Sequence, residues 1–276
     1  MSSQHTPQAQ ASTQTPVAVV TGAARGIGLA TTQLFLDEGW RVALIDRDVP
    51  ALTEAHEALV SSQHMTPEQA QHRLLAVNCD VSVPDQVDQM AIDVAAWGSR
   101  VDALVNNAAV ADFGAMDQMS FEAWRTVMQT NLDGVFLCSQ ALIPALKQTQ
   151  GAIVNIASIS GLRASTLRVA YGTSKAAVIH LTKQQAAELG EFHVRANCVA
   201  PGPVRTKLAI AVHSPEIIAA YHDAIPLNRY GSEIEIANAI VFLCSPKASY
   251  ITGQVLAADG GFDSTGVGLP ALRSVG

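Results

Sequence analysis

Short apolar runs alternate with longer stretches of mixed polar and apolar residues along this chain. The runs are rich in Val, Ile, Ala and Leu, which is typical of parallel strands buried on both faces. They lie at residues 17–21, 41–46, 74–78, 101–105, 152–157, 193–200 and 253–258. Because helix-forming stretches separate these runs, the pattern predicts an α/β fold, a doubly wound parallel sheet of about seven strands with helices on both faces.

The stretches between the strands give the expected helices. These are residues 29–38, residues 49–59, a helix opening at Ser82 and Pro84, one long helix at 121–147, a helix from Tyr171 to 190, and residues 234–243. Residues 61–73 are polar and contain Pro67. This segment could be an extension of the preceding helix or a surface loop, and the sequence does not decide between the two. Residues 204–227 contain helix formers without a strand pattern, and we expect a substrate lid over the strand ends there.

A single domain at residues 17–262 accounts for this alternation, since no linker or repeat interrupts it. Residues 1–16 are mostly Gln, Ser, Thr and Ala. They offer too little apolar surface to offset the entropy of ordering, so we expect a disordered polar leader. Residues 263–276 form a C-terminal tail, which we expect at a subunit interface.

Charge and cysteine spacing narrow the possible partners. The 276 residues carry a net charge of −7 and their 17 Lys and Arg are scattered, which argues against a nucleic-acid or anionic-membrane surface. No apolar run reaches the ~18 residues of a membrane helix and no signal-peptide pattern begins the chain, so we expect a cytoplasmic protein. The four Cys lie far apart and the eight His show no ligand spacing. Neither a metal site nor a disulfide framework is therefore predicted.

A glycine-rich turn follows the first apolar run. Gly22, Gly26 and Gly28 would let the backbone approach a pyrophosphate at the amino end of a helix. Their spacing differs from the common dinucleotide fingerprint, so an ordinary tight turn is the alternative. Asp46 ends the second strand 24 residues after Gly22, close to the separation expected for a carboxylate that binds the adenosine ribose. A helix cap is the other interpretation of Asp46.

Three groups with acid–base chemistry stand close together after residue 157. Ser158 follows a buried strand and should lie at its carboxyl end, where open α/β sheets bind ligands. Tyr171 and Lys175 are spaced i, i+4 on a predicted helix and share a face. A fixed positive charge favours the phenolate and would lower the tyrosine pKa toward the working range. A solvated helix face is the alternative for an isolated pair of this kind.

With these residues the chain resembles the short-chain dehydrogenase/reductase family, in its short single-domain branch with a Tyr-x-x-x-Lys active site. The resemblance covers residues 17–262 and implies a Rossmann-type fold. It rests on motifs that follow the family's order: Thr21 to Gly28, Cys79-Asp80-Val81, Asn106 to Ala109, Asn131, Ser158, Tyr171 with Lys175, and Pro201-Gly202.

The resemblance implies a role for each matching residue. Tyr171 would be the general acid/base, Lys175 would lower its pKa and bind the nicotinamide ribose, and Ser158 would hold the substrate oxygen. Asn131 would keep a proton-relay water in place. The implied cofactor-binding set is Gly22, Arg25, Gly26, Ile27, Gly28, Asp46, Arg47, Asp80, Val81, Asn107, Tyr171, Lys175, Pro201, Gly202, Val204 and Thr206.

Two departures from the family pattern concern the cofactor. Ala109 stands where the family usually has Gly, which narrows the space near the nicotinamide. Arg25 and Arg47 occupy positions that are often basic in NADP-preferring relatives, whereas Asp46 occupies the NAD-type position. We expect the acid to dominate, because its charge repels a 2′-phosphate at contact distance.

These observations predict an NAD-dependent oxidoreductase that interconverts a secondary alcohol and a ketone by hydride transfer, working as a homotetramer. An NADP-dependent ketone or 3-oxoacyl reductase is the alternative, and a dinucleotide-binding sensor without catalysis is a third. Candidate substrate-pocket residues are Val110, Arg163, Arg168 and the lid. Arg168 could pair with a substrate carboxylate or face solvent, and the substrate itself is left open.

Overall fold

The computed structural model describes residues 15–206 and 213–266. Its centre is one seven-stranded sheet in the order β3-β2-β1-β4-β5-β6-β7, and every pair of neighbouring strands is parallel. The predicted doubly wound sheet is therefore confirmed. The strands are β1 (Val17–Thr21), β2 (Arg41–Asp46), β3 (Leu74–Asn78), β4 (Ala103–Asn106), β5 (Ala152–Ile156), β6 (Arg195–Pro201) and β7 (Val255–Ala258).

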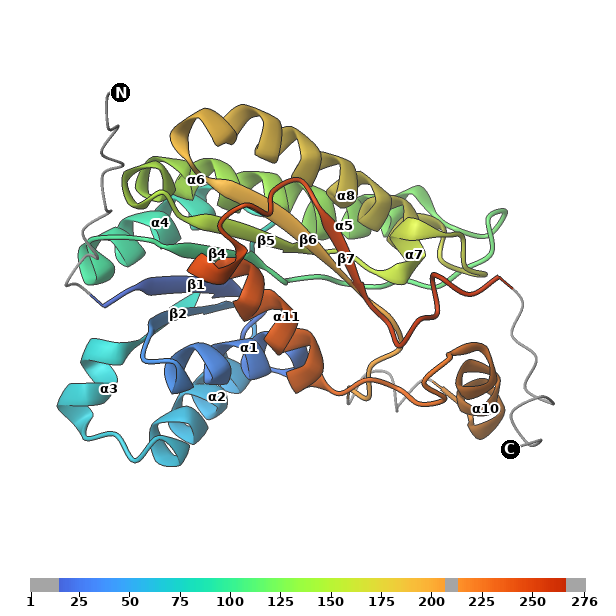
Figure 1. Ribbon diagram of the computed structural model, residues 1–276, viewed down its shortest axis with the longest axis horizontal. Helices are drawn as coiled ribbons and strands as arrows, with labels where there is room; N and C mark the ends of the chain where they lie inside the picture. The colour runs from blue at the N-terminus through green and yellow to red at the C-terminus, as the bar shows by residue number, and fades with distance from the viewer. Residues whose placement is uncertain (1–14, 207–212, 267–276) are drawn as a thin grey trace, which may run out of the picture.

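Helices cover both faces of this sheet (Figure 1). On one face lie α4 (Pro84–Gly98), α5 (Phe121–Met128), α6 (Gly134–Thr149) and α8 (Val169–Leu189). On the other lie α1 (Gly26–Asp37), α2 (Val49–Ser62), α3 (Pro67–Arg73) and α11 (Glu233–Cys244). The short α7 (Ile159–Leu162) and α10 (Pro215–Ala224) lie at the carboxyl edge of the strands, on the right in Figure 1.

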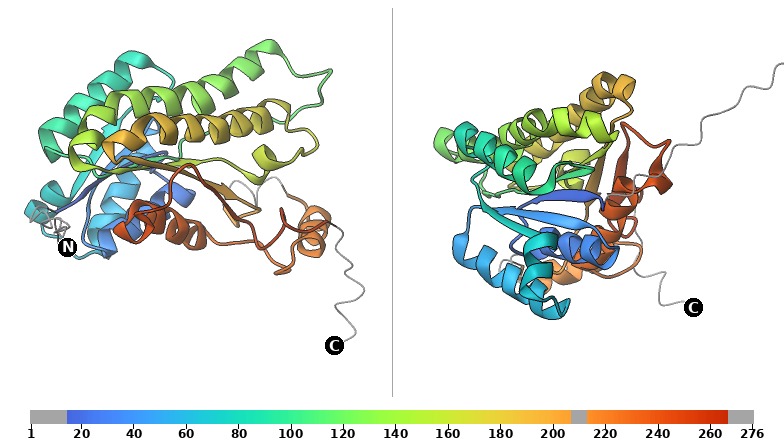
Figure 2. Two further views of the ribbon diagram at one scale, coloured as in Figure 1. Left: turned by 45° about the horizontal axis from the view of Figure 1, so that its top comes forward. Right: turned by 90° about the vertical axis from the view of Figure 1, so that its left-hand side faces the viewer.

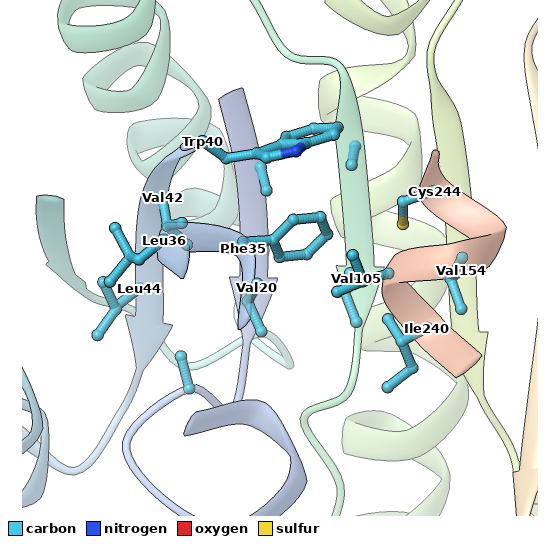
Figure 3. Packing of buried hydrophobic residues seen from close by; sticks show 14 of the residues in the cluster. Val20, Phe35, Leu36, Trp40, Val42, Leu44, Val105, Val154, Ile240 and Cys244 are labelled. Atoms are coloured by element: carbon cyan, nitrogen blue, oxygen red, sulfur yellow. The ribbon is translucent and has the colours of Figure 1, made fainter. Parts of the chain in front are cut away.

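Alternate side chains of each strand enter different cores. On β1, Ala18 and Val20 belong to the cluster under α1 and α11, whereas Val19 belongs to the cluster under α4 and α6. This is the period of two that a strand imposes on its side chains. In the first cluster, the rings of Phe35 and Trp40 lie 4.8 Å apart, and Figure 3 shows both over the sheet. Burial on both faces explains why the strands are almost entirely apolar.

The strand order reverses between β1 and β4, since β2 and β3 extend the sheet to one side of β1 and β4 to β7 extend it to the other. Loops that leave β1 and β4 therefore diverge and open a crevice at their carboxyl ends. Ligands of open α/β sheets bind at this switch point. The glycine turn after β1 and the segment after Asn106 both lie there.

The long helix expected at residues 121–147 forms without a break in the helical backbone, but it contains a π-helical turn that was not predicted. The structure has α5, then a π-helical turn η1 (Gln129–Asp133), then α6. In the π turn the N–H of Gly134 bonds to the carbonyl of Gln129, five residues earlier. Periodicity in the sequence does not resolve one inserted residue, and such insertions often accompany functional sites. Asn131 lies in the centre of this turn.

Residues 61–73 resolve into the end of α2 and a separate helix, α3. Thr66 caps α3 through the N–H of Gln69, the Gln69 side chain bonds back to the N–H of Thr66, and Pro67 occupies the first helical position. This is a capping box, a strong signal for a helix start. The sequence therefore contained the information that separates helix from loop here.

Parts of three predicted segments lie outside the described residues. They are residues 1–14 of the leader, 207–212 of the lid and 267–276 of the tail, so the expectations for those residues stay predictions. Pro16, the last residue of the predicted leader, is already bonded to the sheet, because its carbonyl accepts a hydrogen bond from Arg41 N at 2.9 Å. Among the helices of the described residues, none is long and apolar enough to cross a membrane.

Candidate active site

Ser158, Tyr171 and Lys175 come together at the carboxyl end of β5. Ser158 is the residue that begins α7, and its hydroxyl accepts a hydrogen bond from Ser160 N at 3.1 Å. Tyr171 lies in the first turn of α8, close enough to Ser158 for the serine hydroxyl to lower the pKa of its phenol. Lys175 lies one turn later, is buried, and donates from Nζ to the carbonyl of Ile156 at 2.7 Å. The strand end and the helix thus place a hydroxyl, a phenol and an ammonium around one point.

The electrostatics of the pair differ from the sequence-based expectation. Burial raises the pKa of Tyr171, against the lowering effects of the Ser158 hydrogen bond and the positive charge of Arg168. Burial lowers the pKa of Lys175 to about 8. The expected lowering of the tyrosine pKa by Lys175 is therefore not found. The ammonium is directed to the Ile156 carbonyl, and its Nζ lies 5.7 Å from the centroid of the phenol ring.

Asn131 is completely buried in the π turn, and its side chain holds two segments together. Its Oδ1 accepts from Val110 N at 2.8 Å, and its Nδ2 donates to Val110 O at 2.9 Å and to Ser174 Oγ at 3.1 Å. Ser174 Oγ in turn donates to the carbonyl of Tyr171 at 2.7 Å. The amide therefore fixes the segment after β4 against the helix that carries Tyr171. A water-holding role for Asn131 stays a prediction.

The glycine turn has the shape of a phosphate cradle. A Cβ on Gly28 would lie 2.1 Å from Gly22 O, so only Gly allows helix and strand to approach this closely. Gly26 has a φ of +58°, and a Cβ there would have no neighbour nearer than Glu233 Oε1, at 3.7 Å, among the described residues. Helix α1 starts at Gly26, and Arg25 gives it no side-chain cap. Its free N–H groups suit the pyrophosphate of a dinucleotide.

Asp46 is not a helix cap. Its Oδ2 accepts from Ala24 N at 3.1 Å and its Oδ1 from Asp48 N at 3.0 Å, so the carboxylate lies against the glycine turn. The cap of α2 is Asp48, whose side chain accepts from Ala51 N. Asp48 also forms an ion pair with Arg25. The position of Asp46 at the end of β2 is that required of a ribose ligand.

The second arginine of the cofactor region is also paired. Arg47 lies 3.2 Å from the Asp80 carboxylate, which accepts further hydrogen bonds from the N–H and hydroxyl of Ser82. Val81 is buried beneath η1, and a Cβ on Gly134 would lie 2.7 Å from its Cγ2. These contacts hold Asp80 and Val81 in place after the end of β3, on the side of the cleft where we expect the adenine.

The Asn107 residue holds the glycine turn in place through hydrogen bonds to the end of β1. Its Nδ2 donates to the carbonyls of Thr21 and Gly22 at 3.0 Å, and its own N–H bonds to Thr21 Oγ1. The neighbouring Asn106 joins β4 to β5 by donating to Asn155 Oδ1 at 2.8 Å. We did not predict the role of Thr21, although a hydroxyl at the last position of an otherwise apolar strand was a visible signal.

The segment after β6 closes the other side of the cleft. Gly202 lies so near Asp259 that a Cβ would approach the Asp259 Cα to 2.7 Å. Val204 is buried and forms an isolated bridge with Gly231, and Thr206 N bonds to Val204 O at 2.8 Å. Pro201 ends β6. These residues, with the half-buried Ile27 of α1, surround the cleft at positions compatible with the predicted cofactor contacts.

The candidate pocket residues divide between the two walls of the site. Val110 is bound to Asn131, as described above. Arg168 lies over the ring of Phe113 at 3.7 Å, and Arg163 lies over the ring of Phe262 at 4.4 Å. The roles of Phe113 and Phe262 were not predicted, because no sequence motif connects these rings to the arginines.

A hollow of about 660 Å³ lies between Pro226 at the end of the lid, Gly231 and Asp259. None of the predicted catalytic residues lines it. Within the described part of the chain, no group of three His, Cys, Asp or Glu side chains is arranged to hold a metal ion. The four cysteines are buried and free.

The buried ammonium of Lys175 should give stability a particular pH dependence. Because folding lowers its pKa from 10.5 to about 8, the unfolded chain holds the extra proton between these values. Wild-type stability should therefore rise with pH in that window, relative to Lys175→Met, by up to ~2 kcal/mol between pH 7.5 and 9.5. Urea unfolding of both proteins at the two pH values measures the difference. Lys183→Met, which removes an exposed lysine of the same helix, is the control, and an equal response in both variants would contradict the assignment.

Comparisons with known proteins agree with this geometry. A family model described as enoyl-(acyl carrier protein) reductase matches residues 22–263. The chain is 36% identical over 245 residues to the 3-oxoacyl-[acyl-carrier-protein] reductase FabG of Chlamydia trachomatis, covering 88% of this chain and 96% of that protein. It is 37% identical over 246 residues to the FabG of Thermotoga maritima, covering 89% and 96%.

Solved structures give the same result. A short-chain type dehydrogenase/reductase from Mycobacterium ulcerans superposes with a TM-score of 0.85 at 30% identity, over 91% of this chain and 90% of that one. The RhlG/NADP active-site complex of Pseudomonas aeruginosa superposes with a TM-score of 0.82 at 31% identity, over 90% and 96%. With its sheet, its glycine turn and a match across nearly the whole fold, the chain belongs to the short-chain dehydrogenase/reductase family.

Proposed function

We propose that the protein interconverts a ketone and a secondary alcohol, using a nicotinamide dinucleotide, with NAD preferred to NADP. The observation that supports this most is the meeting of Ser158, Tyr171 and Lys175 beside the nucleotide cradle. When bound, the nicotinamide would supply or accept the hydride at the substrate carbon. The side chains of this chain have the other tasks, which are to hold the substrate oxygen and to move its proton.

Each catalytic group has a distinct task in this proposal. The Ser158 hydroxyl donates a hydrogen bond to the carbonyl oxygen and fixes its direction. Tyr171 donates its phenolic proton to that oxygen during reduction and takes it back during oxidation. Since burial raises the pKa of Tyr171, the phenol is protonated at neutral pH and ready to act as an acid. Alcohol oxidation needs the phenolate and should therefore be faster at alkaline pH.

Removal of the phenolic proton tests the mechanism. Tyr171→Phe should lower kcat by ~10²–10⁴-fold, the range of a single general acid, while the cofactor Kd stays within about threefold because the ring remains. Stopped-flow rates of ketone reduction and fluorescence titration with NADH measure the two quantities. Turnover near that of wild type would rule out Tyr171 as the acid. If wild type binds NADH and reduces no ketone, a non-catalytic sensor becomes the better interpretation.

The preference for NAD is argued from Asp46. Its carboxylate lies against the glycine turn, where it would accept hydrogen bonds from the ribose hydroxyls and repel a 2′-phosphate. Arg25 and Arg47, the two cations nearest in sequence, are engaged by Asp48 and Asp80. These pairs are exposed and therefore weak, so a phosphate could recruit the arginines if Asp46 were absent.

Exchange of this carboxylate tests the preference. Wild type should use NAD with a kcat/KM at least about tenfold above that with NADP, equivalent to ~1.4 kcal/mol. Asp46→Ser should raise kcat/KM with NADP and lower it with NAD, because the repulsion is removed and both arginines become available. Initial rates of wild type and Asp46→Ser with NAD and with NADP measure these values of kcat/KM. Equal use of NAD and NADP by the wild type would show that Asp46 does not select the nucleotide.

A 3-oxoacyl reductase that uses NADP is the second candidate, because the FabG relatives at 36% and 37% identity carry the name 3-oxoacyl-[acyl-carrier-protein] reductase. This activity uses the same three catalytic groups and the same chemistry. The two candidates differ in the cofactor and in the group attached to the ketone. The N-acetylcysteamine thioester of acetoacetate, offered with NADH and NADPH in turn, distinguishes them.

We also propose a cytoplasmic homotetramer in which α5, α6 and α8 meet their copies. Phe121 of α5 is 76% exposed and Phe136 of α6 is 48% exposed, and apolar rings on a helix surface of this kind favour burial between subunits. Light scattering at micromolar concentration should give about four times the 29.0 kDa chain mass. A monomer under those conditions would refute the proposal.

A further inference from the structure

Two loops form one wall of the substrate entrance. The segment after β4 and the segment that joins α7 to α8 lie next to one another at the carboxyl edge of the sheet (Figure 2, left). The N–H of Gly114 bonds to the carbonyl of Leu167 at 3.2 Å, and Gly114 forms an isolated bridge with Arg168. Backbone contacts thus fix the position of Arg168.

The side chain of Arg168 stacks on an aromatic ring of the neighbouring loop. Its guanidinium lies over the Phe113 ring, 3.7 Å from the centroid, and the residue is only half-exposed. Its charge acts on Tyr171, where it opposes the effect of burial on the pKa, and on His213, whose pKa is lowered first by burial and then by this charge.

Arg168 is one of the arginines that form no ion pair within the described residues. Four arginines form ion pairs, namely Arg25, Arg47, Arg100 and Arg229. Arg163, on the opposite wall, donates to the carbonyls of Phe262 and Asp263 at 2.9 Å and 3.3 Å. Arg168 makes no ion pair within residues 15–206 and 213–266. Stacking on a ring leaves the in-plane N–H donors of a guanidinium free for a planar anion.

We propose that Arg168 binds a carboxylate of the substrate, so that the substrate is an oxo acid or hydroxy acid. This deepens the proposed function and rests on it. The distance from the reacting carbonyl should be short, because Arg168 stands three residues before Tyr171 and its carbonyl accepts the N–H of Gly172 as α8 begins. The carboxylate would lie a few bonds from the oxygen held by Ser158 and Tyr171.

The position of Arg168 favours a substrate carboxylate over other anions. The pyrophosphate cradle is built at the amino end of α1, from the opposite helix layer, so Arg168 is not placed for the cofactor phosphates. A carrier-linked 3-oxoacyl thioester is neutral close to its ketone. A free carboxylate matches the guanidinium fork with two parallel hydrogen bonds.

Matched pairs of acid and ester test the proposal. Full-length protein is assayed with acetoacetate and methyl acetoacetate, and with 4-oxopentanoate and its methyl ester, together with the acetoacetyl N-acetylcysteamine thioester. At least one acid should exceed its ester in kcat/KM by about tenfold or more, the scale of a bidentate charged pair. Arg168→Gln should reduce that ratio about tenfold. Arg168→Lys should keep part of it, because a point charge attracts the acid without the bidentate geometry.

Two further variants separate recognition from loop structure. Arg73→Gln removes an arginine of α3, which lies in the opposite helix layer and away from the site, and should leave the acid-to-ester ratio at its wild-type value. Phe113→Leu removes the stacking ring and should lower the ratio, which provides a second test if Arg168→Gln does not fold. Calorimetry with Tyr171→Phe and bound cofactor should show tighter binding of the acid than of the ester, independent of turnover.

Several outcomes would overturn the inference. Equal kcat/KM of wild type for the acids and for the esters or the thioester would overturn it, and so would an unchanged acid-to-ester ratio in Arg168→Gln. Reduction of neutral ketones alone would also reject it while the proposed function stands. If no ketone of any kind is reduced, the proposed function fails and the inference fails with it.

Discussion

The Nζ atom of Lys175 donates a hydrogen bond to the Ile156 carbonyl, across the boundary between α8 and β5. Because β5 leads directly to Ser158 and α8 carries Tyr171, this single contact fixes the relation between the hydroxyl and the phenol. The ammonium is nearly inaccessible to water, and burial disfavours its charged form. The fold thus keeps a charge whose burial is destabilising at the point where strand and helix meet. Active sites often contain groups of this kind, which lower the stability of the protein.

A second set of contacts extends this arrangement to the neighbouring strand. The π turn directs the Asn131 amide toward Val110 on one side and Ser174 on the other. The segment after β4, which would border the nicotinamide in the proposed function, is therefore positioned by the same helix that carries Tyr171. Below the glycine turn, Asn107 and Thr21 have a similar function between β1 and β4. Side-chain to backbone bonds, rather than loop length alone, define the geometry at the switch point.

The sequence was sufficient for the sheet and for the proximity of the catalytic groups. Short continuous apolar runs rich in β-branched residues identify buried strands, and i, i+4 spacing identifies residues on one helix face. It was not sufficient for three features. One inserted residue at Gln129 to Asp133 does not alter helical periodicity enough to be seen. The direction of the Lys175 ammonium depends on a carbonyl 19 residues away. The stacking of Arg168 on Phe113 depends on a loop contact between segments that share no pattern.

The substrate entrance is assembled from contacts between parts of the chain that are far apart in sequence. Arg163 binds the carbonyl of Phe262, 99 residues later, and Gly114 binds the carbonyl of Leu167. Closing such long loops is entropically slow, whereas α1 and β2 can associate locally. We expect the entrance to form late in folding and to open first under mild denaturant, before the sheet itself unfolds. Substrate selectivity would then be lost at a lower denaturant concentration than the one that disrupts the glycine turn and abolishes dinucleotide binding.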